Sequence, residues 1–529
     1  MKDVSHNVDP ESVDSENMVA QGNLTSICCR ALLAVLGQQR VALPGSVVYN
    51  ASLESYFAAQ QAALHPACIV SPQTTQDVSK AIKSLTTQGN EQPKFAIRGG
   101  GHANWAGASN IDGGIVIDLR ALKSVQLNPS KSTVSVGTGA SWDDVYATLD
   151  PLGLSVNGGR AADVGELITL IPSAQALIPR SWDQWLNILI ALIGVGGLTL
   201  GGGISYFSPR YGWTCDTVTN FEIVLADASI VQANTKSNPD LFHALKGGNN
   251  NFGVVTRIDV TTFKQGLLWA GTVYNSLDVV DDVISEFVRI GSPDAYDQDA
   301  SFITTFGFSQ AQGRAVISNQ LEYAKPVEPP SIYKGFLALP NLLSTSQLVN
   351  TTTLAKATRA LQPEHPRTLS RVSTFVLTPE VLKSTYVQWN ASLSSISQVA
   401  NIIWGIALEP LPPGIYARHA KDNALGLENR KGSFVVALLT ASWTDPSNDA
   451  LVVEAANNLL KAINTEAKKL GDLDPFVYLN YAGKDQDPIR SYGAASVAQL
   501  QTVRKRVDPK GVFTSQVPGG FKIPPKANV

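Results

Sequence analysis

Apolar residues recur along most of this chain with two periods, and the two periods alternate. Helical spacing places four apolar residues on one face after a capping box from Thr74 to Asp77. Short apolar runs with the character of strands follow at residues 95–97 and 115–119. Because helices and strands keep alternating from residue 71 onward, the pattern predicts an α+β layer arrangement. The four residues of the helical face are Val78, Ala81, Ile82 and Leu85.

The pattern changes near residue 265, where we expect a domain boundary. Strands become longer, as at residues 402–408 and 434–443, and amphipathic helices begin at Pro379 and after Pro446. The tail then returns to the mixed pattern of the first half. Four segments are expected: 1–44, a polar leader and a short helix; 45–265, a first domain; 266–474, a second domain; and 475–529, a segment that rejoins the first.

Composition is that of an ordinary globular protein. The 529 residues are 44% hydrophobic and 16% charged, and the formal net charge is −3. Lys and Arg do not cluster, so neither nucleic acid nor an anionic membrane is an expected partner. Six His and four Cys show no HExxH or CxxC spacing, and we expect no metal site.

Cysteines and glycosylation sequons give conflicting signals about localisation. Four sequons, at Asn23, Asn50, Asn350 and Asn390, favour a secretory route. Residues 1–22 nevertheless lack the apolar core of a signal peptide. Four cysteines allow three complete pairings, and the sequence does not choose among them. They are Cys28, Cys29, Cys68 and Cys215.

Residues 166–194 do not fit their surroundings. The segment is apolar, but Pro172, Pro179, Arg180 and Asp183 interrupt it, and its longest apolar run is too short to span a bilayer. The pieces on either side would read smoothly if joined. Two interpretations stay open: a surface insertion or interfacial helix, and a translated intron.

The strongest candidate for chemistry is the stretch FAIRGGGHANWAG from Phe95 to Gly107. An apolar strand runs into Arg98, three glycines and His102. Successive residues without a Cβ let backbone N–H groups approach a pyrophosphate closely. Taken alone, the segment fits an ordinary turn better, and it gains weight only together with the later segments.

Two further segments share this glycine-rich character, and the order of all three is informative. VGGLTLGGGISYFSPRYGWTCD begins at Val195, DLFHALKGGNNNFGVVT begins at Asp240, and YLNY and DPKGVF close the chain. Together they resemble the vanillyl-alcohol-oxidase/PCMH superfamily of flavoproteins, and most closely the berberine-bridge-enzyme-like branch of filamentous fungi. The resemblance covers about residues 45 to 525, except for 166–194.

The resemblance implies a two-domain PCMH-type fold with a split FAD domain and a substrate domain whose antiparallel sheet is backed by helices. It also implies that FAD is the cofactor and that His102 bonds covalently to the flavin 8α-methyl carbon. A neutral imidazole is a suitable nucleophile for that bond. The implied cofactor-binding residues are Arg98, Gly99, Gly100, Gly101, Gly107, Gly196, Gly197, Gly201, Gly202, Gly203, Phe252, Gly253, Val254 and Asn480.

Some relatives in this superfamily carry a second link, to a cysteine. Ala161 aligns with that position, so we expect a single covalent bond, and Cys215 is expected to be a small buried residue. Val164 falls where the family controls oxygen access, and a residue of this kind resembles oxygen-reactive members.

The catalytic base is less certain than the cofactor. Tyr478 is the first candidate, with Tyr481 and Glu409 as alternatives, although Glu409 also reads as a solvated carboxylate before Pro410. The expected reaction is hydride transfer from a small organic substrate (a secondary metabolite, an alcohol or a sugar) to FAD, with reoxidation by O2 to H2O2. The alternatives are a dehydrogenase with another electron acceptor and an inactive or binding-only product.

Overall fold

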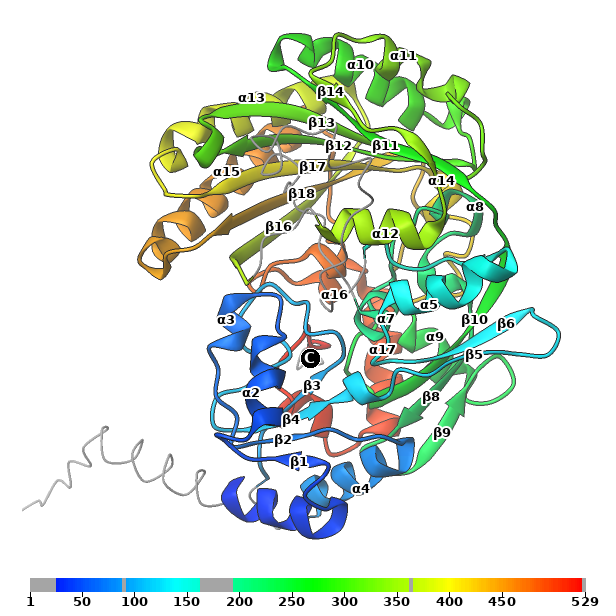
Figure 1. The fold of residues 1–529 in the computed structure, drawn as a ribbon, viewed down its shortest axis with the longest axis vertical. Helices are drawn as coiled ribbons and strands as arrows, with labels where there is room; N and C mark the ends of the chain where they lie inside the picture. The colour runs from blue at the N-terminus through cyan, green and yellow to red at the C-terminus, as the bar shows by residue number, and fades with distance from the viewer. Residues whose placement is uncertain (1–24, 88–91, 162–193, 361–364, 526–529) are drawn as a thin grey trace, which may run out of the picture.

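The computed structural model describes residues 25–87, 92–161, 194–360 and 365–525. They form two small sheets in one half of the molecule and a large sheet in the other (Figure 1). The last part of the chain crosses back, so that helix α17 (Ala494–Val507) lies among the elements of the first half (Figure 1).

The first small sheet carries the strand that leads into the glycine segment. Its order is β1-β2-β4-β3, with β2, β4 and β3 parallel. Helix α4 (Thr75–Thr86) connects β2 to β3, and Thr74 caps it by accepting a hydrogen bond from the backbone N–H of Asp77. The strands are β1 (Val41–Ala42), β2 (Cys68–Val70), β3 (Phe95–Arg98) and β4 (Ile115–Asp118).

The second small sheet is antiparallel and faces the first across a cleft. Its order is β5-β6-β10-β8-β9, and β7 pairs with the far end of β10. Alternate residues of β6, among them Val134 and Val136, are fully buried as the sequence pattern predicts. The strands are β5 (Val125–Leu127), β6 (Thr133–Gly137), β7 (Leu154–Val156), β8 (Val218–Val224), β9 (Ile230–Ala233) and β10 (Val254–Lys264).

Among the described residues, the large sheet has nine strands, all paired antiparallel. Helices α10 (Val280–Gly291), α13 (Pro379–Ile396) and α15 (Asp449–Leu470) cover its outer face, whereas α12 (Thr351–Ala360) lies on the inner side against α5 (Trp142–Leu149) (Figure 1). The main strands are β11 (Leu268–Asn275), β12 (Ala300–Ser309), β13 (Arg314–Tyr323), β16 (Arg367–Val376), β17 (Ile403–Leu411) and β18 (Phe434–Trp443). Short strands β14 (Leu343–Ser344), β15 (Gln347–Val349) and β19 (Leu473–Asp474) complete it.

Most predicted elements are confirmed at the residue level. The helix at residues 25–36, the capped helices α4, α5 and α13, and the strands β17 and β18 lie where the periodicity places them. A disulfide joins Cys29 to Cys68, while Cys28 and Cys215 are buried free thiols. Of the sequons, Asn50 and Asn390 are exposed.

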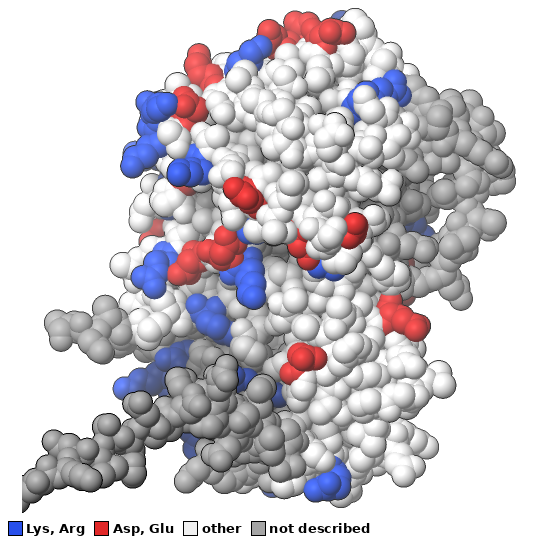
Figure 2. Space-filling view, turned by 90° about the vertical axis from the view of Figure 1, so that its left-hand side faces the viewer, with Lys and Arg blue, Asp and Glu red and all other residues white. Residues whose placement is uncertain are grey.

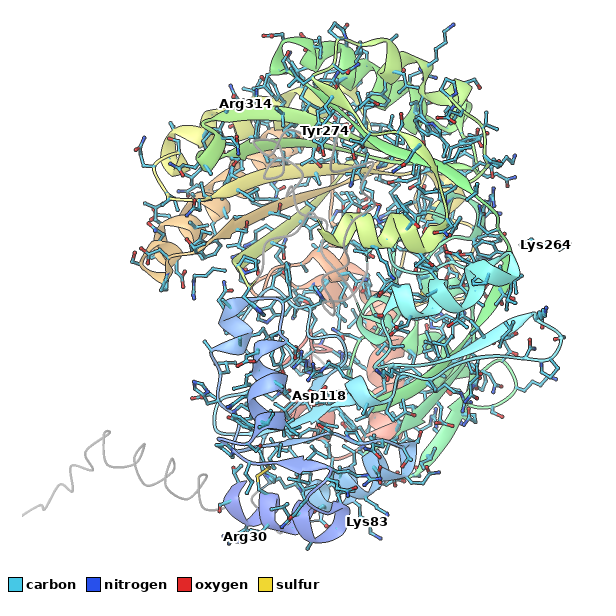
Figure 3. The ribbon with its side chains drawn as sticks, viewed as in Figure 1. Arg30, Lys83, Asp118, Lys264, Tyr274 and Arg314 are labelled. Atoms are coloured by element: carbon cyan, nitrogen blue, oxygen red, sulfur yellow. A yellow bond between two sulfur atoms is a disulfide. The ribbon has the colours of Figure 1, made fainter. Side chains whose placement is uncertain are left out.

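Charge is spread thinly over the surface. On the face drawn in Figure 2, acidic and basic side chains are interspersed and most of the visible surface is uncharged. In Figure 3, Arg30 and Lys83 lie at the periphery, whereas Asp118 lies in the interior at the end of β4. In the described part of the chain, no helix is both long and apolar enough to cross a bilayer.

Candidate active site

A cleft with an empty volume of about 1160 Å³ lies between the two small sheets and reaches the large sheet at Ser370. Glycines from separate segments form much of its wall, so the backbone is exposed to whatever enters. A site of this size suits a large ligand. The glycines are Gly99, Gly100, Gly101, Gly194, Gly196, Gly197, Gly253 and Gly520.

The first glycine segment lines the cleft directly after β3. Gly99, Gly100, Gly101 and His102 all contribute to the wall, as expected from the sequence. Gly101 has φ +79°, and an added Cβ would lie 2.7 Å from Nε of Arg98. The turn therefore requires glycine at this position.

Arg98 has a different place from the one expected. Its side chain is fully buried on the far side of the glycine turn and does not line the cleft. The guanidinium donates to the backbone oxygens of Ser52 and Ser55, at 2.6 and 2.8 Å, and lies 3.7 Å from Asp118. Although burial opposes it, Arg98 and Arg120 hold the pKa of Asp118 below its usual value. Arg98 thus supports the turn from behind.

The second glycine segment divides into two parts with different roles. Gly196 and Gly197 lie in the short helix α7 (Val195–Leu200), not in a turn, and both line the cleft. Gly201, Gly202 and Gly203 do not line it. A Cβ on Gly201 would lie 2.0 Å from Oδ1 of Asn480.

At the other two positions an added Cβ would meet protein as well. Gly202 faces Leu425 and Trp213, and Gly203 faces Thr214. These glycines permit close packing of the chain, and none of Gly201, Gly202 and Gly203 lines the cleft, so a contact between them and the cofactor stays a prediction.

The third segment is divided in the same way. Gly253 and Val254 line the cleft, but Phe252 is completely buried in the core. Gly107 lies beside the tail in a neighbouring cavity, which the ring pair Trp105 and Phe521, 5.1 Å apart, separates from the cleft. The sequence therefore marks the right segments but not which residues of each reach the ligand.

His102 lines the cleft directly after the three glycines. Its ring stacks on Phe57 with centroids 4.8 Å apart, which fixes the plane of the imidazole. Asn480 and Leu479 of the returning tail line the same cleft, and the Asn480 amide donates to the backbone oxygen of Leu198 and to the Tyr478 hydroxyl, both at 3.0 Å.

A small recess lies beside the cleft, and the two share Asn104 and Ser370. Tyr481 lines this recess. None of the residues around it carries a charge, so the recess favours a neutral, partly polar group. They are Asn104, Thr368, Leu369, Ser370, Leu438, Thr440 and Tyr481.

Behind Tyr481 lies a buried ionic cluster that crosses between the two halves. Arg160 donates to both carboxylate oxygens of Glu409, at 2.5 and 3.1 Å, and to the Tyr481 hydroxyl at 2.6 Å. Tyr481 in turn donates to Glu409 at 3.0 Å. Burial raises the pKa of the Tyr481 hydroxyl well above its usual value, although Arg160 opposes this rise.

Two more polar groups border the cluster. Glu322 is buried, and burial raises its pKa to about 8 against the opposing effect of Arg160. The Tyr206 hydroxyl donates to the backbone oxygen of Arg160. Glu322 therefore keeps a proton more readily than an ordinary carboxyl group, next to the ion pair of Arg160 and Glu409.

The structure separates the three candidate bases. Tyr481 and Glu409 lie together, and Glu409 is 4% exposed, so the solvated interpretation is wrong. Tyr478 lines neither the cleft nor the recess; it packs against Trp213 with ring centroids 5.4 Å apart. Burial raises the pKa of Tyr478 as well.

The remaining site predictions concern the loop after β7. Ala161 is buried, and Cys215 is a fully buried thiol whose pKa burial raises, as expected for a small core residue. Val164 and all of segment 166–194 except Gly194 lie outside the described residues. Sequence reasoning missed Arg160, Glu322 and Tyr206; the one local signal was an arginine directly after two glycines.

Comparison with known families gives this geometry a context. Residues 66–165 and 182–234 match the family described as FAD binding domain. The matched ranges omit residues 166–181, the first part of the segment that does not fit its surroundings.

Two curated relatives are similar to nearly the whole chain. The FAD-dependent monooxygenase CTB5 of Cercospora beticola is 32% identical over 514 residues, which cover 94% of this chain and 92% of the relative. Oligopeptidase PhomG' of Diaporthe leptostromiformis is 46% identical over 499 residues, 93% of this chain. This chain spans only 37% of the length of that second relative.

Solved structures share the fold. A xylooligosaccharide oxidase from Myceliophthora thermophila has a TM-score of 0.72 and 19% identity, with coverage of 96% of this chain and 100% of the other. The protein BBE-like 1 of Physcomitrella patens has a TM-score of 0.71 and 20% identity, with coverage of 94% and 100%. The two-domain α+β fold expected from the sequence is confirmed.

Proposed function

Because the chain belongs to the FAD-dependent oxidoreductases of the vanillyl-alcohol-oxidase/PCMH superfamily, in its berberine-bridge-enzyme-like branch, we propose that it is an oxidase. It oxidises a small organic substrate, and O2 is reduced to H2O2. The observation that carries this proposal is the position of Tyr481, which lines a recess that shares Asn104 and Ser370 with the glycine-walled cleft.

The residues of the cleft fit FAD. At Gly197 an added Cβ would meet no heavy atom within 4 Å, so bare backbone faces open space there. Gly99, Gly100 and Gly101 would hold the pyrophosphate through backbone N–H groups. In this proposal His102, held by Phe57, also bonds covalently to the flavin.

When bound, FAD accepts a hydride from the substrate. The protein handles the proton of the group being oxidised. Tyr481 accepts it at the phenol oxygen while its own proton moves to Glu409, 3.0 Å away. Glu409 ends protonated, and one hydride and one proton have left the substrate.

One preparation tests the proposal. The purified protein is first scanned in the visible range and then precipitated with acid. Flavin that stays in the pellet supports covalent FAD, and colourless protein contradicts the proposal. Oxygen uptake and peroxide release are then measured with a panel of alcohols, sugars and phenolic metabolites. A reaction with artificial dyes and no oxygen uptake would instead indicate a dehydrogenase.

The name of the Cercospora relative favours a second candidate, a monooxygenase. The two activities differ in the fate of oxygen. With ¹⁸O2, an oxidase yields labelled peroxide and an unlabelled organic product, whereas a monooxygenase transfers one labelled atom to the product. Mass spectrometry of the product separates them.

A further inference from the structure

Arg160 lies behind Tyr481 and binds both other members of the cluster. We propose that Arg160 is a positioning residue: it fixes the Tyr481 hydroxyl as a hydrogen-bond acceptor toward the substrate, so that the reacting group of the substrate is an uncharged O–H. This inference rests on the proposed function and adds a residue and a substrate class to it.

The hydrogen bonds of Tyr481 can be accounted for completely. A phenol has one O–H donor and two acceptor positions. The donor is used by Glu409 at 3.0 Å, and one acceptor position is used by Arg160 at 2.6 Å. Only one acceptor position is left, and Tyr481 lines the recess. A substrate that bonds to this oxygen must therefore donate.

Only an arginine can make both contacts in this geometry. One guanidinium nitrogen bonds to Oε1 of Glu409, and the other serves Oε2 and the Tyr481 oxygen together. The planar fork of arginine holds several acceptors at fixed directions, whereas a lysine ammonium does not. Arg160 thereby fixes the positions of Glu409 and Tyr481 relative to each other, although the two come from distant parts of the chain.

The surroundings of the cluster favour an uncharged substrate group. The titratable groups that face it are Glu322, Tyr206 and Tyr478, all buried and neutral at neutral pH. Arg160 and Glu409 already neutralise each other. Among the described residues, an anionic substrate group in the recess would find no unpaired cation, and a cationic group would find no unpaired anion.

The proton step is balanced within these residues. The substrate O–H bond breaks and a new O–H bond forms on Tyr481, while the original Tyr481 proton moves to Glu409. The Arg160 cation stabilises the negative charge that passes through the phenol oxygen. The hydride of the same substrate goes to the flavin, so no other reactant is needed.

Arg160→Met tests the role without requiring a substrate. The variant leaves a carboxylate buried without its cation, and such a group takes up a proton. Infrared spectra at neutral pH should then show the carbonyl stretch of a protonated carboxyl group in the difference between Arg160→Met and the double variant Arg160→Met/Glu409→Gln. Wild type minus Glu409→Gln should lack this band. Protonated Glu322 is common to all four proteins and cancels.

Kinetics test the same role through pH. Anaerobic flavin reduction by Arg160→Met should be slower by about 10²–10⁴ at neutral pH and should recover as the pH rises. The rising limb of the profile should move upward by ~1–3 pH units. Arg160→Lys, which restores the charge but not the fork, should recover part of the rate.

Arg210→Met is the matched control. Arg210 forms a mostly buried pair with Asp299 at 2.5 Å, away from the cleft, and Lys325 also pairs with Asp299, so this carboxylate keeps a cation when Arg210 is removed. The variant should lose stability without a carboxyl band and without a change in the pH profile. If Arg160→Met does not fold, Arg160→Lys is compared with Arg210→Lys by the same two measurements.

The proposal is overturned if Arg160→Met lacks the carboxyl band, keeps the wild-type pH profile, or if Arg210→Met reproduces its changes. A substrate whose reacting group is an anion also overturns it. If wild type is reduced by no compound at all, the proposed function fails, but the infrared comparison still decides the role of Arg160.

Discussion

The glycine-walled cleft and the Arg160–Glu409–Tyr481 cluster lie close together but are built in opposite ways. The cleft consists of short contiguous segments whose backbone is exposed, as at Gly99–Gly101. The cluster consists of three single side chains, separated by 249 and 321 residues and largely buried, of which Tyr481 lines the recess.

This difference reflects two tasks. A large cofactor can be held by backbone groups. Any sequence provides these groups where glycines leave the backbone exposed. Proton transfer needs particular ionisable groups at fixed distances, and these come only from side chains. The five predictions below are intended to separate the two regions experimentally.

The largest effect is expected at His102, which lines the cleft. We predict that His102→Ala transfers all flavin from the acid pellet to the supernatant, because no other His or Cys lines the cleft in the part of the chain that the structure describes. Absorbance of both fractions measures it. Phe57→Leu is the control, since it removes the stacked ring but keeps the imidazole; flavin in the pellet of His102→Ala would contradict the linkage.

Tyr481→Phe should affect chemistry alone. We expect flavin reduction to slow by about 10²–10⁴ while flavin content stays normal. Stopped-flow reduction under anaerobic conditions measures the rate. Tyr478→Phe serves as the comparison because Tyr478 lines neither cavity; a greater loss from Tyr478→Phe than from Tyr481→Phe would reverse the assignment of the base.

Breaking the ion pair should lower the free energy of unfolding. Replacing both partners by apolar residues should restore most of it. Glu409→Leu leaves Arg160 buried and unpaired, and we expect a loss of about 3–5 kcal/mol in the free energy of unfolding. The double variant Arg160→Met/Glu409→Leu should regain most of it without regaining activity. Denaturant unfolding measures this; a double variant as unstable as the single one would mean that the cluster serves the fold.

Glu322 gives a prediction about pH. Its pKa is about 8 in the folded protein against a reference value of 4.5, so the folded state holds the extra proton between these values. Stability should therefore fall as the pH rises from about 4.5 to 8, by up to ~1.4 kcal/mol per pH unit. Glu322→Gln should remove this slope, which unfolding at several pH values would reveal; an unchanged slope would assign it to another group.

The smallest effect is expected in the cleft wall. Gly197→Ala adds a Cβ that meets no protein atom, inside helix α7. We predict about 1 kcal/mol of added helix stability and, in contrast, weaker loading of FAD into flavin-free protein. Gly266→Ala is the control, since its added Cβ also meets nothing, its φ is not in the left-handed region, and it does not line the cleft. Equal FAD loading in both variants would argue against backbone contact at Gly197.

Sequence reasoning succeeded where information is local. FAIRGGGH encodes a strand, a turn and a nucleophile within eight residues, and the fold places three of its glycines and His102 on the cleft as expected. Sequence reasoning failed within the same segment at Arg98, because adjacency in sequence does not determine on which side of a turn a side chain lies.

The cluster could not have been predicted from local patterns. Arg160 follows two glycines and resembles any loop arginine until the fold brings Glu409 and Tyr481 beside it. Gly201–Gly203 show the converse. This run of glycines lets protein neighbours such as Asn480 and Thr214 pack closely against the backbone. Long-range packing decides both cases, and it cannot be inferred from a single sequence.

The return of the tail across the cleft has a consequence for biosynthesis. Wall residues extend from Ile97 to Phe521, and Asn480 fills the space beside Gly201. A chain that lacks residues 480–529 therefore has an incomplete pocket, however well its earlier parts are folded. We expect FAD to be captured only after these residues have been synthesised and have folded against the first half.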